Sequence, residues 1–256
     1  MVNVETKTEE LLVVIAEAER AVLEVYNSGD IQVETKSDDS PLTQADLAAH
    51  RILISGISKL YPDIPVVSEE GNEYENQQLV TKERFWLVDP LDGTREFIAR
   101  SGHFTICAAL IEEDMPSFGV VNAPALGVTY YGGSALNGAY RITANESPKN
   151  IHTQSHVPPI VVASLSNLNH DTGSYIAENY PDSEILRVGS QLKLPKIAEG
   201  AADVYPRLGD PLHLWDIAAG HAILEGAGGT MTRFDGSPID YHNQALKAGD
   251  FIAQNH

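Results

Sequence analysis

The chain has 256 residues, of which 43% are hydrophobic and 21% charged, a composition typical of globular proteins with room for one large domain or two modest ones. Its formal net charge is −19, with 17 lysine and arginine residues against 36 acidic ones. This balance excludes a nucleic-acid partner held through its phosphates, because no basic cluster is available to displace counterions. An anionic ligand would need bridging cations.

The location of the protein is predicted from what the sequence does not contain. No apolar run approaches the length of a membrane span, and the acidic stretch Glu5 to Glu10 is unlike a signal peptide. We therefore expect a cytoplasmic protein with no integral membrane segment, with peripheral inner-membrane association as an option, and either a monomer or a homodimer. The single cysteine, Cys107, is expected in the core.

The first part of the chain mixes helical and strand patterns. Its expected elements are a helix over 8–26, a strand over 31–36, a polar turn over 36–41, a helix over 44–60 that Thr43 caps, strands at 66–67 and 85–88 flanking a loop over 73–82, and strands over 104–110, 118–121 and 128–131. Turns separate the last three strands, which predicts an antiparallel meander.

A polar, proline-containing stretch over 144–159 is the best candidate boundary. After it, strands expected over 161–163, 185–188 and 203–205 alternate with helices expected over 171–180, 191–198 and 215–226. Such alternation is typical of an α/β arrangement. We therefore expect an N-terminal α+β half over residues 1–145, with a largely antiparallel sheet, and a C-terminal α/β half over residues 146–256.

One apolar run ends abruptly in acidic residues, at Asp89-Pro90-Leu91-Asp92-Gly93-Thr94. Proline and glycine predict a turn directly after the strand, so that Asp89, Asp92 and Thr94 crowd one strand end. Two carboxylates on such a turn repel each other unless a cation lies between them, and hard oxygen ligands suit Mg²⁺. In the alternative interpretation, Asp92 or Thr94 merely caps the helix that Arg95 begins.

Further acidic residues strengthen the prediction of a cation site. Glu69 and Glu70 also follow an apolar strand, and Asp216 lies at the start of an expected helix. Each has an ordinary explanation alone, as solvated surface or as a helix cap, and Asp46 in the first turn of its helix is most often a partner for the helix dipole. Their occurrence together with the strand-end pair favours a metal site.

These residues resemble the Mg²⁺-dependent, lithium-sensitive inositol monophosphatase family. The family pattern is an acidic pair after a strand, then Asp-Pro-Leu/Ile-Asp-Gly-Thr, then a distant Trp-Asp-x-Ala-Ala-Gly, which stand here at Glu69-Glu70, Asp89 to Thr94 and Trp215 to Gly220. Segments 36–46, 95–98 and 204–207 are similar to the 3′(2′),5′-bisphosphate nucleotidase branch. The resemblance extends over about residues 36–241 and implies a layered αβαβα sandwich of the sugar-phosphatase type.

The resemblance also implies roles for individual residues. Two or three Mg²⁺ ions are expected, one held by Glu69, Asp89 and the backbone carbonyl of Leu91, and a second by Asp89, Asp92 and Asp216. The implied catalytic residues are Asp46, Thr94 and Glu69, of which Asp46 and Thr94 position and deprotonate the attacking water. The implied substrate contacts are Gly93, Thr94, Ser190, Lys193, Arg207 and Asp216.

The branch implies that 3′-phosphoadenosine 5′-phosphate (PAP) is hydrolysed to AMP and phosphate, a reaction of sulfur metabolism. Two or three cations can neutralise the phosphoryl oxygens, lower the pKa of water and hold the leaving oxygen, which predicts direct in-line attack with no phospho-enzyme. Asp89 and Asp92 are spaced as Asp-x-x-Asp, unlike the Asp-x-Asp of enzymes with an aspartate nucleophile. Asp89 is therefore interpreted as a ligand.

Two segments depart from the branch. Ser164 to Asn167 reads Ser-Leu-Ser-Asn where related nucleotidases have Ser-Arg-Ser-His, and Gly209 to His213 differs from the Gly-Pro-Thr spacing expected before Trp215. The first departure supports an alternative, an inositol or sugar phosphate phosphatase on the same scaffold. The second alternative is a catalytically silent acidic protein that binds divalent cations or a nucleotide, which has no need of Thr94 beside Asp46.

Overall fold

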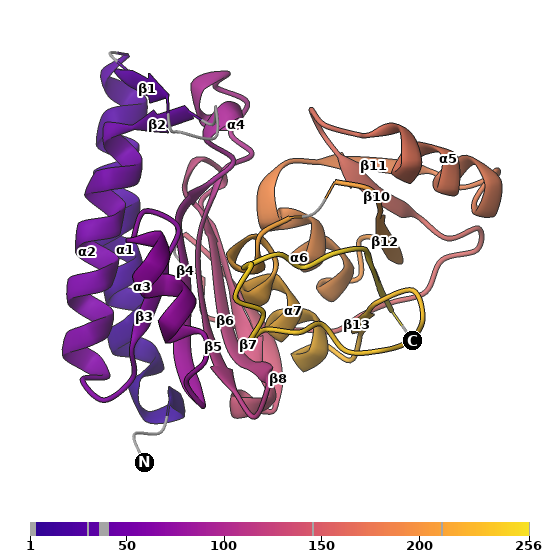
Figure 1. Cartoon of the computed structure of the whole chain (residues 1–256). Helices are drawn as coiled ribbons and strands as arrows, with labels where there is room; N and C mark the ends of the chain where they lie inside the picture. Colours follow the sequence, from indigo (N-terminus) through magenta and orange to yellow (C-terminus); the bar gives the residue numbers. More distant parts are fainter. Residues whose placement is uncertain (1–3, 30, 36–40, 145, 211, 256) are drawn as a thin grey trace.

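The computed structural model describes residues 4–29, 31–35, 41–144, 146–210 and 212–255. Its elements form five layers, and Figure 1 shows them in order across the molecule. Helices α1 (Val4–Ser28) and α2 (Gln44–Leu60) form the first layer, a seven-stranded sheet the second, and α6 (Lys193–Ala198) with α7 (Ala218–Gly226) the third. A five-stranded sheet and α5 (His170–Asn179) complete the molecule, so the expected αβαβα sandwich is confirmed.

The seven-stranded sheet has its strands in sequence order. They are β3 (Val66–Ser68), β4 (Arg84–Asp92), β5 (Thr105–Glu112), β6 (Met115–Ala123), β7 (Val128–Gly133), β8 (Gly138–Thr143) and β9 (Lys149–Ile151). Only the β3–β4 pair is parallel, and the other pairs are antiparallel. Because β9 pairs with β8, this sheet continues past the boundary expected between residues 145 and 146, and the chain enters the second sheet only at Val161.

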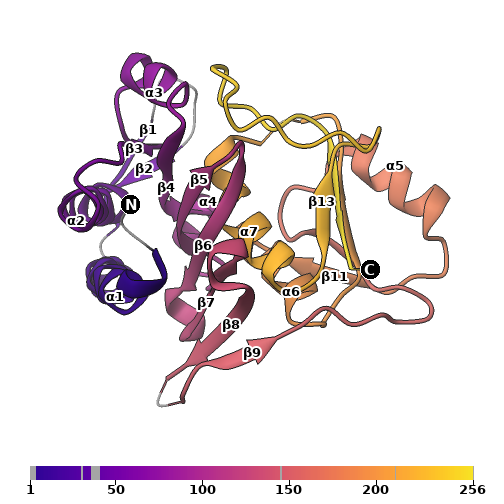
Figure 2. The same ribbon diagram turned by 90° about the horizontal axis from the view of Figure 1, so that it is seen from below.

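The second sheet has the order β11-β10-β12-β14-β13. Its strands are β10 (Val161–Ser164), β11 (Ile185–Val188), β12 (Val204–Arg207), β13 (Thr230–Thr232) and β14 (Phe251–Gln254). The first three are parallel, as the strand–helix alternation predicts, whereas β14 joins β12 and β13 in antiparallel fashion. Figure 2 shows α6 and α7 between the two sheets.

Shorter elements complete the chain, and one of them corrects the sequence prediction. Strands β1 (Val33–Thr35) and β2 (Pro41–Thr43) form a small ribbon, and the turn expected over 36–41 lies mostly outside the described residues. The loop expected over 73–82 contains a helix, α3 (Glu73–Leu79), because the Asn72 side chain caps it by accepting from the N–H of Glu75 (3.0 Å). Helix α4 (Thr94–Ile98) and 3₁₀ turns at Pro124–Leu126, Ser134–Leu136, Ser190–Leu192 and Leu214–Asp216 make up the rest.

Strand β4 connects the two large hydrophobic clusters, because its side chains alternate between the faces of the sheet. Trp86 and Val88 pack with the α1–α2 layer, whereas Phe85 and Leu87 pack with the C-terminal half. On that second face a Cβ at Gly119 of β6 would come within 2.2 Å of the Ala219 carbonyl oxygen, so α7 lies directly on the sheet. Among the residues described, no helix combines the length and apolarity that a membrane crossing requires.

Candidate active site

The carboxyl end of β4 carries the first two acids of the site. The strand continues to Asp92 and does not stop after Val88, contrary to the sequence prediction. Asp89 pairs with Cys107 and Asp92 with Thr105, so β4 has one more residue than β5 over this stretch. Such a bulge re-aims side chains while keeping the strand in the sheet, and it accommodates Pro90, which has no N–H to donate.

Three aspartates meet at this strand end. One carboxylate oxygen from each of Asp89, Asp92 and Asp216 lies within 4.8 Å of the other two. Asp216 arrives from the C-terminal half on the 3₁₀ turn Leu214–Asp216, where its Oδ2 accepts the N–H of His213 (2.9 Å). The predicted set Asp89, Asp92 and Asp216 is therefore assembled across more than 120 residues of sequence.

Protein groups compensate the charges of the three acids only in part. Burial raises the pKa of Asp89 and of Asp216 well above the usual range, and the neighbouring carboxylates raise both further. Burial also raises the pKa of Asp92 to about 6, although the nearby Lys193 ammonium opposes the change. The free energy stored in these charges is available to a bound cation.

Glu69 lies beside the three aspartates but outside that tight group. Its backbone N–H donates to the Val88 carbonyl (3.1 Å), and its carboxylate raises the pKa values of Asp89 and Asp216. Glu69 lines one pocket of about 260 Å³ with Asp89, Asp92, Asp216 and Leu91. The structure thus brings all five predicted metal ligands to one cavity.

Asp46 and Thr94 are also in contact. The Thr94 hydroxyl lies 3.2 Å from Asp46 Oδ1 and 3.2 Å from the Leu91 carbonyl oxygen, and it can donate to either. The second oxygen, Asp46 Oδ2, accepts from the N–H of Thr43 (2.8 Å) and from its hydroxyl (2.6 Å) in a capping box at the start of α2. Asp46 therefore both caps its helix and holds Thr94. Burial raises its pKa against the effect of these hydrogen bonds.

The helix-cap interpretation of the β4 motif is wrong in its details. Helix α4 begins at Thr94, and its N-cap is Gly93, which has φ 88° and makes no side-chain cap. The left-handed conformation requires glycine here, and a Cβ would lie 3.2 Å from the His103 carbonyl oxygen and from Ser190 Cβ. Gly93 therefore lets the 3₁₀ turn Ser190–Leu192 approach the end of β4.

Ser190 and Lys193 lie at this approach. Ser190 has φ 49°, and its buried Oγ has no hydrogen-bond partner among the described residues. Lys193 donates from Nζ to the Ser190 carbonyl and lies 5.7 Å from the centroid of the Tyr205 ring. Burial lowers the pKa of Lys193, whereas Asp92 raises it, so this cation belongs to the electrostatics of the acidic cluster.

Arg207, the last predicted substrate contact, is buried at the end of β12 and is already paired. Its Nη2 lies 3.1 Å from Asp210 Oδ2, and its Nε donates to the Asp210 carbonyl (3.2 Å). Arg207 does not line the pocket of the aspartates, but its charge affects the pKa of Lys193. Of the predicted substrate contacts, Gly93, Thr94 and Asp216 line the pocket, whereas Ser190, Lys193 and Arg207 are not among its lining residues.

Sequence reasoning missed Gln191, a buried residue that links Asp92 to the backbone next to Asp216. Its backbone N–H donates to Asp92 Oδ2, its Nε2 donates to the Trp215 carbonyl (2.9 Å), and its Oε1 accepts from the N–H of Gly220 (2.6 Å). The adjacent Ser190 and Lys193 matched the family pattern, but nothing in the sequence marked the glutamine between them. Only its position between β4 and α7 shows that it is a structural link.

His213 was also missed, because the histidines show no metal-ligand spacing. It lines the pocket, its ring stacks on Trp215 with centroids 4.8 Å apart, and its Nε2 lies 2.7 Å from Lys247 Nζ. His213 belongs to the departing segment Gly209 to His213, and the other departing segment, Ser164 to Asn167, also reaches the site, since the Ser166 hydroxyl donates to Glu96 Oε1 at the pocket wall. Both departures from the family pattern therefore alter the surroundings of the acids, not the acids themselves.

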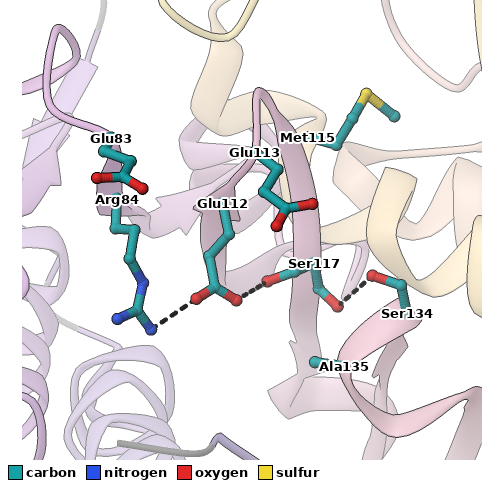
Figure 3. Close-up of a pocket in the computed structure, with 8 residues that line it drawn as sticks. All are labelled: Glu83, Arg84, Glu112, Glu113, Met115, Ser117, Ser134 and Ala135. Carbon is teal, nitrogen blue, oxygen red and sulfur yellow. Dashed lines mark hydrogen bonds and ion pairs between the residues drawn. The ribbon is translucent and has the colours of Figure 1, made fainter. Parts of the chain in front are cut away.

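A second cavity lies at the opposite end of β4 and differs in chemistry (Figure 3). Arg84 begins β4, roughly 26 Å along the strand from Asp92, and its Nη2 lies 2.6 Å from Glu112 Oε1. Ser117 donates to the other oxygen of Glu112 (2.7 Å). Glu112 is thus paired with a cation and a hydroxyl group, whereas the three aspartates lie close together with raised pKa values, so the pocket at Asp92 is the better candidate site.

The αβαβα sandwich and the acidic pocket are those of a sugar-phosphatase-type fold. The comparison of sequences identifies the family. The family model described as the inositol monophosphatase family matches residues 4–256. The chain belongs to this family.

Similar proteins narrow the comparison. The chain is 42% identical over 223 residues to the 3′(2′),5′-bisphosphate nucleotidase CysQ of Salmonella typhimurium, covering 86% of this chain and 88% of the relative. It is 39% identical to the protein of the same name from Buchnera aphidicola, covering 88% and 83%. The crystal structure of CysQ from Bacteroides thetaiotaomicron, a bacterial member of the family, superposes with a TM-score of 0.83 at 32% identity, covering 98% and 97%.

Proposed function

We propose that this chain is a Mg²⁺-dependent 3′(2′),5′-bisphosphate nucleotidase that hydrolyses PAP to AMP and phosphate. One observation carries the chemistry: one carboxylate oxygen from each of buried Asp89 and half-buried Asp92 and Asp216 lies within 4.8 Å of the other two, beside the hydrogen-bonded pair Thr94 and Asp46. The substrate is supported by relatives named as bisphosphate nucleotidases, at 42% identity over most of the chain in the Salmonella typhimurium case.

The donor atoms of the pocket fit Mg²⁺. All five predicted ligands offer oxygen, which this hard cation prefers. Burial and the neighbouring carboxylates raise the pKa values of Asp89 and Asp216, and a bound cation would oppose both effects. We propose that Glu69, Asp89 and the Leu91 carbonyl hold one ion, and that Asp89, Asp92 and Asp216 hold a second. When bound, such ions withdraw charge from a phosphoryl group and acidify water.

The residues Thr94 and Asp46 supply the route for the proton. When the Thr94 hydroxyl donates to Asp46 Oδ1, its oxygen lone pairs remain available to accept a proton from a water molecule in the pocket. Asp46 can then hold the proton, because burial has already raised its pKa. Thr43 fixes the other oxygen of Asp46, so only Oδ1 is available to Thr94.

The substrate contacts follow from the groups around the aspartates. Backbone N–H groups of Gly93 and Thr94, which line the pocket, are proposed for the phosphate that is cleaved. The buried Ser190 hydroxyl, which has no hydrogen-bond partner among the described residues, is proposed as a further contact. Lys193 and Arg207 are proposed for the second phosphate, since charge-assisted hydrogen bonds to phosphate are the strongest that side chains form. Asp216 borders the same pocket and is proposed to contact the leaving group.

An inositol or sugar phosphate phosphatase is the second candidate, because Ser166 bonds to Glu96 in the segment that departs from the nucleotidase pattern. Phosphate release from PAP and from inositol 1-phosphate, with Mg²⁺ and with excess chelator, separates the possibilities. We expect Mg²⁺-dependent release with a preference for PAP. A preference for inositol 1-phosphate would overturn the substrate, and absence of release from both would leave a silent cation-binding protein.

The remaining expectations concern the cell. The proposed substrate is a small nucleotide, and the net charge of −19 makes binding to nucleic acid unfavourable. A cytoplasmic location, peripheral membrane association and the choice between monomer and homodimer stay predictions.

A further inference from the structure

Asp210 occupies one edge of the Arg207 guanidinium group. Nε of Arg207 donates to the Asp210 carbonyl oxygen (3.2 Å), and Nη2 donates to its carboxylate Oδ2 (3.1 Å). Nε and Nη2 together form an edge with which arginine makes a two-point contact with phosphate. The Arg207 side chain is only 5% exposed, so it has little freedom to present another edge. A phosphate approaching this edge must compete with Asp210.

The backbone holds Asp210 in this position. The N–H of Leu208 donates to the Thr172 hydroxyl (3.0 Å), and the N–H of Gly209 donates to Asp250 Oδ1 (2.9 Å). The N–H of Asp210 donates back to the Leu208 carbonyl (3.0 Å). These bonds attach the segment to α5 and to Asp250, which directly precedes β14. These backbone hydrogen bonds therefore hold Asp210 next to Arg207.

The charge of Asp210 matters because few cations are available there. Lys193 and Arg207 act on each other electrostatically, since Arg207 lowers the pKa of Lys193 after the larger effect of burial. Together they offer two positive charges to a second phosphate, and the Asp210 carboxylate neutralises one of them. The Asp210 side chain is 60% exposed, so it can turn into solvent when a competing anion binds to Arg207.

We propose that Asp210 is a specificity-determining residue that restrains the binding of a second phosphate. It reserves the Nε–Nη2 edge of Arg207 and thereby reduces the advantage of a bisphosphate over a monophosphate substrate. The inference rests on the proposed function, in which Arg207 and Lys193 receive the second phosphate. If Asp210 instead held Arg207 in its productive pose, its removal would weaken binding, so the two roles predict opposite signs.

AMP is the probe for the second-phosphate position, because it carries that phosphate alone and is not turned over. Its affinity is measured by calorimetry in Mg²⁺ buffer for the wild type, for Asp210→Ala, and for Asp210→Asn, which removes the charge with little change in shape. We expect AMP to bind about three- to tenfold more tightly to both variants. Exposed Asp182 provides the matched control, and Asp182→Asn is expected to bind AMP like the wild type.

A second arm tests whether the effect passes through Arg207. In an Arg207→Gln background, Asp210→Ala should produce no gain in AMP affinity. The ratio of kcat/KM for PAP to kcat/KM for 3′-AMP should rise by a similar factor in Asp210→Ala alone. Unchanged or weaker AMP binding, or the same gain without Arg207, would overturn the inference. Failure of the wild type to hydrolyse PAP would overturn the proposed function, and the AMP titration is independent of that result.

Discussion

The exchange Asp92→Asn should make the metal-free protein more stable while it abolishes activity. Asp92 Oδ2 accepts both from the Thr105 hydroxyl (3.2 Å) and from the Gln191 N–H. The amide oxygen of asparagine can take both bonds, with its NH₂ group directed toward the other aspartates. The substitution therefore removes a charge from the cluster and keeps the shape and the hydrogen bonds of the side chain.

The magnitude follows from the titration of Asp92. The folded protein raises its pKa from 3.8 to about 6, which corresponds to roughly 3 kcal/mol at about 1.4 kcal/mol per tenfold change in proton affinity. Because the folded pKa is raised, wild-type stability falls as the pH increases from about 4 to above 6. Asp92→Asn does not show this loss, because asparagine does not ionise. We expect it to be about 1–3 kcal/mol more stable than the wild type at pH 8, and nearly equal to it at pH 4.

The assay is urea unfolding at both pH values with excess chelator, repeated at pH 8 with Mg²⁺. Added Mg²⁺ should reverse the order, because the wild type retains the full ligand set and gains stability by binding. Asp182→Asn again serves as the control, and it should show neither effect. If Asp92→Asn is less stable than the wild type in the metal-free protein at pH 8, the Asp92 charge does not destabilise the metal-free fold, and the reasoning is refuted.

Three further predictions address the other parts of the site. Thr94→Ala should lower kcat about 100-fold or more, with little change in KM. Thr94→Ser should retain most activity, because the hydroxyl remains beside Asp46. Steady-state kinetics in which the two variants behave alike would contradict the proton route. Gln191→Met leaves the Trp215 carbonyl and the Gly220 N–H without their side-chain partner, so the Mg²⁺ concentration at half-maximal binding should rise several-fold in a calorimetric titration, and an unchanged value would refute a linking role. Chelation of Mg²⁺ should abolish phosphate release and lower the melting temperature, both restored by Mg²⁺, whereas release that persists in excess chelator would refute metal dependence.

Local patterns along the chain were sufficient to predict much of the framework. The period of apolar residues gave the two long N-terminal helices, the antiparallel meander and the alternating second half, because a face that packs on a core must repeat with the period of its backbone. The acids were identifiable for a similar reason. Asp89 and Asp92 interrupt a buried run, and a carboxylate in such a place requires a partner.

Other features depended on contacts between distant parts of the chain. The extension of β4 to Asp92 and the pairing of β9 with the first sheet are set by neighbouring strands, which local propensity does not encode. Helix α3 was missed because its single buried residue, Asn76, gives no apolar periodicity.

The sequence by itself determined which acids form the site, because the residue types and the order of the three motifs carry the chemistry. Only the tertiary structure decided how they meet: the bulge of β4, the close approach of α7 at Gly119 and the link through Gln191 bring Asp216 to Asp92. It also showed that Arg207, which the family resemblance implied as a substrate contact, is paired with Asp210. A sequence shows which residues are charged, but the partner of each charge is set by contacts between distant parts of the chain, which form only when the chain folds.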